Sequence, residues 1–403
     1  MNVSETIDVL SAISVLREQG RPMALATIVS VRGSTYRRPG ARLLVPDEGA
    51  SVGNLSGGCL EGEVEELGRG VMASGESRLT LYDLTADDEV IWGWGLGCNG
   101  AIEVFVEPAE RAAEIAETLK DAIENERTVA IATVLASSSS SPSSPSSSSS
   151  PSSSSPSPSS PSSSLVPVGA RLLVRPHEDR RGSTGVVALD DELEIRAREA
   201  LLSGRTAAVT VAVSGHEVRA FIESVLPPLR LLVCGAGHDA IPVVKLASEL
   251  GWRTVVVDDR PEFLDRARFP GAGEFVEAQP GEAASKAGSD RRCYALVMSH
   301  NYLRDRDYLK SFLASDVAYI GMLGPQPRTE RLLADLATEG IVPSPQRLSV
   351  IHGPAGLDLG SEGPEEIAVA VVAELLAVAR AREGGHLRDR TGTIHDHLEP
   401  AQS

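Results

Sequence analysis

An apolar run that ends in a glycine-rich turn, residues 231–240, constrains the fold of this chain more than any other feature. It reads Leu-Leu-Val-Cys-Gly-Ala-Gly-His-Asp-Ala, and a second apolar run, residues 254–257, ends at Asp258. A strand, a Gly-x-Gly-x-x-Ala turn, a helix and a second strand in this order are typical of a βαβ dinucleotide-binding unit. Gly235 permits the tight turn, and Gly237 lets the backbone approach a phosphate at the helix N-terminus.

Three polar residues near this turn are candidate ligand contacts. Asp258 lies about 20 residues beyond the turn, where such units place a carboxylate on a ribose hydroxyl. His238 lies inside the turn, and His300 follows residues 295–298, which we expect to form a strand. Because ligands bind at the carboxyl ends of strands in such sheets, either histidine can contact a ligand. A hydrogen-bonded structural histidine is an equal alternative for each.

The second half of the chain alternates short apolar runs with helical segments. We expect a helix over residues 364–382, because Pro364 suits a first helical turn and the adjacent acidic residues suit its dipole. The alternation predicts a Rossmann-like, doubly wound parallel sheet. Its expected strands are residues 229–234, 254–257, 274–277, 295–298, 315–321 and 348–352, and its other helices are residues 239–250 and 329–339.

The first half of the chain contains an internal repeat. Residues 24–29, Ala-Leu-Ala-Thr-Ile-Val, are echoed by residues 130–135, and Gly-Ala-Arg-Leu-Leu-Val occurs at both 40–45 and 169–174. The sequence offset between the two copies is larger for the second matching segment than for the first. The second copy therefore has additional length between its first two strands. We therefore predict a duplicated α/β domain over residues 1–226, with a strand–loop–strand–helix–strand unit in each copy.

The additional length is a tract, residues 137–164, that contains only Ser and Pro. It has no apolar side chain to bury, so it cannot offset the entropy of ordering, and we predict a disordered linker inside one loop. A role in binding is the alternative. The predicted domains are then residues 1–226, a Rossmann-like domain over 227–385, and a flexible tail over 386–403.

Composition excludes several classes of function. A net charge of -18 and only 4% aromatic residues argue against nucleic acid as a partner. No stretch reaches the roughly 20 apolar residues of a membrane span, and the first residues lack the basic region of a secretory signal. The cysteines form no Cys-x-x-Cys pair, so we expect neither disulfides nor structural zinc, and a reducing cytoplasm.

Cys59 is the strongest single candidate for chemistry. It follows Ser56-Gly57-Gly58 and precedes residues 60–67, which we expect to be helical. Unpaired N–H groups and the dipole at a helix start favour a thiolate. The second copy has Ala188 at the equivalent position, so the thiol belongs to one copy only. A small buried residue at a tight turn is the alternative.

Cys98 lies in a loop, residues 93–100, that has four glycines. Such a loop permits close approach to a ligand, and a plain hairpin turn explains it equally well. Together, Cys59 and Cys98 could hold a soft metal or receive sulfur, with Cys59 as the metal ligand. Arg37 and Arg38 suit a phosphate, although exposed arginines are common.

Several motifs resemble the signatures of the XdhC/CoxI family, and the match runs from about residue 9 to residue 382. The resemblance is carried by residues 33–42, 56–62, 95–98, 299–302, 319–324, 352–360 and 364–368. The Ser/Pro tract departs from the family pattern. So does the segment at residues 324–328, which replaces part of a basic segment and leaves an anion contact there in doubt.

The resemblance implies an accessory factor, not an enzyme, for molybdenum hydroxylases such as xanthine dehydrogenase or aerobic carbon monoxide dehydrogenase. Such factors bind the molybdenum cofactor, as molybdopterin or its dinucleotide form, and support its sulfuration before insertion. The expected partners are the client hydroxylase, a cysteine desulfurase-type sulfur donor and a second copy of the chain. The alternative is an NAD(P)-dependent oxidoreductase in which the first half forms a substrate lid.

Overall fold

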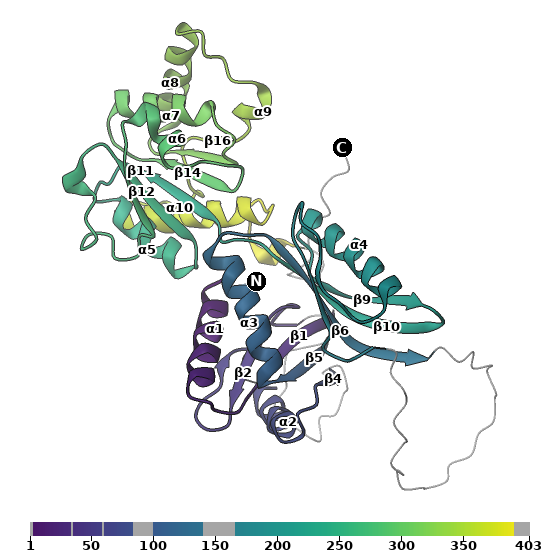
Figure 1. Ribbon diagram of the computed structural model, residues 1–403. Coiled ribbons are helices and arrows are strands. Elements are labelled where there is room, and N and C mark those ends of the chain that lie inside the picture. The colour runs from purple at the N-terminus through teal and green to yellow at the C-terminus, as the bar shows by residue number, and fades with distance from the viewer. Residues whose placement is uncertain (1–2, 34, 59, 84–99, 140–165, 391–403) are drawn as a thin grey trace, which may run out of the picture. The chain divides into compact units, whose positions relative to one another are not determined.

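The computed structural model describes residues 3–33, 35–58, 60–83, 100–139 and 166–390 (Figure 1). The chain divides into two compact units on either side of the bond between Pro227 and Pro228. The first unit contains two antiparallel sheets, and the second contains a parallel sheet. The predicted fold class, a duplicated α/β domain followed by a Rossmann-like domain, is confirmed.

The first unit consists of two copies of one repeat. The sheets have the orders β3-β2-β1-β5-β4 and β8-β7-β6-β10-β9, which are the same permutation. Each copy begins with a helix that the sequence analysis did not predict, so the repeat is longer than expected. The first copy comprises α1 (Val3–Glu18), β1 (Met23–Gly33), β2 (Arg42–Pro46), β3 (Val52–Gly53), α2 (Glu61–Ser74), β4 (Arg78–Asp83) and β5 (Gly100–Pro108). The second comprises α3 (Ala109–Glu124), β6 (Val129–Ser139), β7 (Arg171–Val174), β8 (Arg181–Gly182), α4 (Val187–Ser203), β9 (Ala207–Val213) and β10 (His216–Val225).

Two glycines show that the copies match in backbone detail. Gly53 and Gly182 both have positive φ angles, 99° and 85°. A Cβ would lie 2.3 Å from the Arg42 carbonyl oxygen at Gly53, and 2.4 Å from the Arg171 carbonyl oxygen at Gly182. No other residue fits this approach, so each copy needs glycine where its short third strand pairs with the second.

The Ser/Pro tract lies between β6 and β7, in the loop where it was predicted. The prediction of a linker over its whole length is wrong at its start, because Ser137, Ser138 and Ser139 belong to β6 and pair with β10. A strand ladder uses backbone N–H and C=O groups, so apolar side chains are not required for this pairing. The rest of the tract lies outside the described residues.

Ion pairs exchanged between the copies hold the first unit together. Arg42 of β2 contacts Glu223 of the second copy at 2.5 Å, and each side chain is only 4% exposed. Reciprocally, Arg171 of β7 donates two hydrogen bonds of 2.5 Å to Glu107 of the first copy. The copies therefore pack like the protomers of a two-fold dimer, in which each surface contacts its own equivalent.

A polar contact and an apolar cluster lie where the two copies meet. Arg219 of β10 donates to Glu103 of β5 at 2.7 Å. Beside them, equivalent residues of the two copies pack into one small core, formed by Val29, Phe105, Leu135 and Phe221. These contacts add apolar burial to the exchanged ion pairs.

The second unit is a doubly wound parallel sheet with the order β13-β12-β11-β14-β15-β16. This is the 3-2-1-4-5-6 order of dinucleotide-binding folds, whose direction reverses between β11 and β14. The strands are β11 (Arg230–Cys234), β12 (Arg253–Asp258), β13 (Glu274–Glu277), β14 (Cys293–Val297), β15 (Tyr319–Met322) and β16 (Ile351–His352). Cys234 and Cys293 are buried in the core, as predicted.

Helices cover both faces of this sheet (Figure 1). One face packs against α5 (Ala240–Glu249) and α10 (Pro364–Ala379). The other packs against α6 (Ala283–Lys286), α7 (Tyr302–Leu313) and α8 (Gln326–Thr338). Short helical turns complete the unit: η1 (Pro261–Phe263), η2 (Pro280–Glu282), α9 (Pro345–Leu348) and η3 (Leu387–Asp389).

Three local expectations in this unit are wrong. The strand expected at residues 315–321 begins only at Tyr319, and the start of the strand expected at 348–352 is the end of α9. The sequence pattern did not indicate α7, in which the buried Tyr308, Leu309 and Phe312 follow a charged first half. At η3, part of the expected tail is helical; its last residues, from 391, lie outside the described residues.

We predict that breaking one exchanged ion pair destabilises the first unit, whereas replacing the whole pair does not. Arg42→Met leaves Glu223 buried without its partner and should lower the free energy of unfolding by about 3–5 kcal/mol. Adding Glu223→Leu should recover most of that loss, because the buried charge is then gone. Chemical denaturation of both variants measures this. A double variant as unstable as the single one would contradict it.

Candidate functional site

The glycine-rich turn lies at the carboxyl edge of the parallel sheet, where the strand order reverses. Gly235 has a φ of 106°, and a Cβ there would lie 2.7 Å from the Cα atom of Ser299. The turn after β11 therefore touches the loop after β14, and only glycine permits that contact. Ligands of such sheets bind in the crevice outside these two loops.

Backbone donors gather at this turn. Among the described residues, the N–H groups of Gly237, His238 and Asp239 have no acceptor within the protein. They lie at the N-terminus of α5, and Asp239 does not cap that helix with its side chain. Free N–H groups and the positive end of a helix dipole together suit an anion such as a phosphate. His238 is exposed beside them.

Asp258 does not have the role that the sequence predicted. Its side chain is fully buried, and Oδ2 accepts a 2.7 Å hydrogen bond from the N–H of Ala236. Arg260 donates to both carboxylate oxygens, at 2.8 and 2.9 Å. Burial alone would raise the pKa of Asp258, but these hydrogen bonds hold it below its ordinary value. The carboxylate fixes the glycine-rich turn and has no exposed oxygen for a ribose hydroxyl.

Aspartates at this edge are each paired with a basic side chain. Within the described residues, the pairs are Asp239 with His300 at 2.9 Å, Asp258 with Arg260 at 2.8 Å, Asp259 with Arg304 at 3.0 Å, and Asp305 with Arg328 at 2.7 Å. Because arginines compensate the charges of Asp258, Asp259 and Asp305, these three aspartates do not oppose an anion as bare carboxylates would. The sequence analysis missed most of these residues, although the run Asp258-Asp259-Arg260 directly after a buried strand was a usable signal.

His300 lies across the crevice from the glycine-rich turn. Its ring is 4.0 Å from the position of a Cβ on Gly237, and its Nε2 contacts Asp239. Its φ of 56° is left-handed, a conformation that costs energy for a residue other than glycine. Buried Asp305 holds the loop in place by accepting a 2.5 Å hydrogen bond from Ser299 Oγ. The structure thus brings His300 to the glycine-rich turn.

In the first unit, the loop at residues 35–40 contacts the loop at residues 54–58. The exposed ring of Tyr36 lies 3.6 Å from the position of a Cβ on Gly57. Arg37 forms an ion pair with Glu5 and donates to the Asn54 carbonyl oxygen at 3.2 Å. Arg38 is half-buried and also has a partner within the protein. Arg37 therefore ties the loop at residues 35–40 to the loop at residues 54–58.

Glu61, the first residue of α2, organises the second of these loops. Its carboxylate accepts hydrogen bonds from the N–H groups of Leu55, Ser56, Gly58 and Leu60, and from Ser56 Oγ. Burial alone would raise its pKa, but these donors lower it from 4.5 to about 2. Asp190 does the same at the equivalent place in the second copy, where it accepts from Ser183 and Thr184.

Cys59 and Cys98 lie outside the described residues. The expected advantage of Cys59 was a set of unpaired N–H groups around it. Instead, the N–H groups of its neighbours Gly58 and Leu60 are donated to Glu61, at 2.9 and 3.1 Å. These two donors are therefore not free to stabilise a thiolate.

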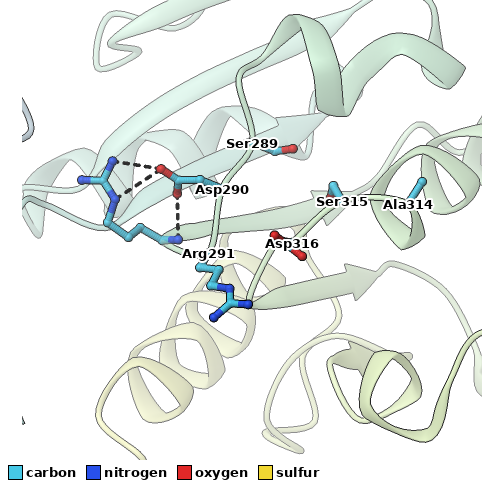
Figure 2. A pocket seen from close by; sticks show the side chains of 7 residues that line it. Ser289, Asp290, Arg291, Ala314, Ser315 and Asp316 are labelled. Atoms are coloured by element: carbon cyan, nitrogen blue, oxygen red, sulfur yellow. Dashed lines mark hydrogen bonds and ion pairs between the residues drawn. The ribbon is translucent and has the colours of Figure 1, made fainter. Parts of the chain in front are cut away.

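A hollow of about 530 Å³ lies at the opposite, amino edge of the parallel sheet (Figure 2). There Asp290 binds the neighbouring Arg292 at 2.9 Å, and Arg291, Ser315 and Asp316 complete the lining. Ligands of doubly wound sheets bind at the other edge, so this hollow is not the candidate site.

The described part of the chain contains no cluster of three His, Cys, Asp or Glu side chains that could hold a metal ion. No helix in that part is long and apolar enough to cross a membrane.

We predict that Glu61 stabilises its loop in a pH-dependent way. Glu61→Gln should lower the free energy of unfolding by about 1–3 kcal/mol at pH 7. Because the folded-state pKa is depressed, the stabilisation is complete above pH 4.5 and is lost as the pH falls toward 2. The difference in free energy of unfolding between parent and variant, measured by denaturation, should therefore decrease as the pH is lowered. Glu63→Gln, on an exposed position of the same helix, is the control; a gap independent of pH would refute the assignment.

The comparisons with known proteins agree with this architecture. The model of the XdhC Rossmann domain matches residues 231–375, and that of the XdhC and CoxI family matches residues 16–83. A protein of Bacillus subtilis (strain 168), described as a probable subunit of xanthine dehydrogenase, is 30% identical over 90% of this chain and 95% of its own length. An uncharacterized protein of Escherichia coli (strain K12) is 29% identical over 44% of this chain, which covers 31% of that protein.

A crystal structure described as a xanthine dehydrogenase from Bacillus halodurans has the same fold. It superposes with a TM-score of 0.69 and 28% identity, covering 93% of this chain and 97% of its own. With both halves matched in order, this chain belongs to the XdhC and CoxI family.

Proposed function

We propose that this chain binds the molybdenum cofactor and supports its sulfuration and insertion into a molybdenum hydroxylase. An accessory role in xanthine dehydrogenase systems is supported by the family and by the relative from Bacillus subtilis. The observation that carries the finer proposal is the set of free N–H groups at Gly237, His238 and Asp239, at the reversal point of the sheet. Molybdopterin and its dinucleotide form both carry phosphate, the group that such a turn binds.

The residues at the crevice fit this cofactor. Gly237 leaves room for a phosphate, since nothing nearer than His300 occupies the position of its Cβ. The exposed His238 and His300 can donate hydrogen bonds to phosphate oxygens. When bound, the cofactor supplies a molybdenum centre whose ligands can be exchanged. The protein supplies hydrogen-bond donors for the phosphate and a turn that Asp258 fixes. Acidic side chains around the crevice are paired with basic ones.

The proposal gives Cys59 the role of soft ligand or sulfur acceptor, because a thiol is the protein group that combines both properties. The glycine-rich loop that contains it is tied down by Glu61 and by Arg37. Cys98 is proposed as a second thiol of the same unit. A cysteine desulfurase-type protein is the proposed sulfur donor, and the hydroxylase is the client.

An NAD(P)-dependent oxidoreductase is the weaker alternative. The strand order and the glycine-rich turn would suit a dinucleotide. The carboxylate that should bind the ribose is, however, Asp258, which is fully buried and held by Arg260 and the Ala236 N–H. Nicotinamide cofactors therefore serve as the comparison ligands in the binding experiment.

We predict that Gly237→Ala binds the cofactor more weakly and keeps the fold. Its new Cβ meets no atom nearer than 4.0 Å, yet it stands where the phosphate must approach the backbone. Cofactor affinity should fall by about 1–3 kcal/mol, with an unchanged melting temperature. Gly235→Ala is the matched control, because its Cβ would meet the Ser299 backbone and should lower the melting temperature. Calorimetry with the molybdenum cofactor and with NAD(P) measures the affinities; equal affinity in Gly237→Ala removes the phosphate site.

We predict that Cys59→Ala retains the fold and fails to mature the client enzyme. The second copy has alanine at the equivalent position, so the scaffold tolerates that side chain. Cys234→Ala is the contrast, since Cys234 is fully buried and its loss should lower the melting temperature without releasing cofactor. Melting temperature, bound molybdenum and client activation are measured side by side. Normal activation by Cys59→Ala would end the thiol proposal.

A further inference from the structure

A second group of polar residues occupies the other half of the carboxyl edge, at the end of β16. His352, the last residue of that strand, contacts Glu374 of α10 through Nδ1 at 3.1 Å. Its ring stacks on Tyr319 of β15, with centroids 4.4 Å apart, and Tyr319 stacks in turn on Tyr294. Packing and one hydrogen bond therefore fix the orientation of the imidazole ring.

Glu374 is built to remain ionised. Besides His352, its carboxylate accepts hydrogen bonds from the Tyr319 hydroxyl and from the N–H of Gly356. Burial alone would raise its pKa, but the hydrogen bonds from His352, Tyr319 and Gly356 hold it below its ordinary value. An ionised carboxylate can only accept, so Nδ1 of His352 is the donor to Glu374, and in the neutral imidazole Nε2 then presents a lone pair.

The Nε2 atom of His352 has no partner among the described residues, and the side chain is 28% exposed. The titratable groups that contact this ring within the described residues are Glu374 and Tyr319. An imidazole that serves only the core needs no open nitrogen. A ring anchored at one nitrogen by a carboxylate and open at the other is the arrangement of histidines that bind ligands.

The position of His352 relates it to the glycine-rich turn. Both lie at the carboxyl edge of one sheet, and the face that carries α10 also carries α5. β11 and β16 are separated by three strand spacings, or about 14 Å, since neighbouring strands lie about 4.8 Å apart. A ligand that joins a phosphate to a heterocyclic ring is long enough to reach both ends of this edge.

We propose that His352 Nε2 accepts a hydrogen bond from a ring N–H of a phosphate-bearing heterocycle whose phosphate occupies the turn at Gly237. This inference rests on the proposed function, in which that heterocycle is the pterin of the molybdenum cofactor. Glu374 acts as a positioning residue, because it selects the tautomer in which Nε2 is an acceptor. The site then distinguishes ligands that donate an N–H at this point from ligands that do not.

The decisive variant is Glu374→Gln. Its amide oxygen can still accept from Tyr319 and Gly356, but its NH₂ group faces Nδ1 of His352 and turns Nε2 into a donor. Nitrogen NMR of the ligand-free protein should show the proton on Nδ1 in the parent and on Nε2 in the variant. Cofactor released from a purified molybdoenzyme should bind the variant about 10- to 100-fold more weakly. Tyr319→Phe, which removes a hydrogen bond to Glu374 and leaves the tautomer, should bind like the parent.

The outcomes separate this inference from the function it rests on. If the parent binds no cofactor, the proposed function and this inference both fail. If the parent binds, Gly237→Ala does not, and Glu374→Gln binds like the parent, the function stands and His352 has no part in it. If Glu374→Gln does not fold, the test uses the parent protein. Its affinity for the cofactor should fall with decreasing pH in parallel with the protonation of His352 observed by NMR. An affinity that does not follow that titration overturns the proposal.

Discussion

The exchanged ion pairs between the two copies are the interaction on which the first unit depends. Arg42 reaches Glu223 and Arg171 reaches Glu107, so each copy supplies the counterion that the other buries. Neither arginine could be buried in this unit without its carboxylate, because a buried unpaired charge is very costly. The two copies therefore form one folded unit, and its sheets carry loops such as the one organised by Glu61.

The parallel sheet carries many charged side chains at one edge, and they are paired with one another. Each aspartate there is matched with a basic side chain, and Asp258 ties the glycine-rich turn from behind. In the described part of the chain, the N–H groups of Gly237, His238 and Asp239 have no acceptor. At the far end of the same edge, Glu374 holds His352 with one nitrogen exposed. Carboxylates with little exposed surface thus fix the glycine-rich turn and the ring of His352 in place.

Local signals predicted much of this architecture. Glycines that need a positive φ angle, as at Gly53 and Gly182, are visible as repeated residues in the sequence. Short apolar runs between helices predicted the parallel sheet, because a strand buried on both faces needs a continuous run of apolar residues. The signal failed for α7, where the charged first half hides the buried face, and for Ser137–Ser139, where pairing uses the backbone alone.

The sequence by itself determined the repeat, the order of the second unit and the glycine-rich turn, since each depends on residues close together in the chain. It also determined which polar residues lie near strand ends. Only the tertiary structure decided their partners. Arg42 and Glu223 are 181 positions apart, and nothing local links them. Asp258 had the right spacing for a ribose contact, but packing buried it against Ala236 and Arg260, and a buried, satisfied carboxylate has no oxygen left for a ligand.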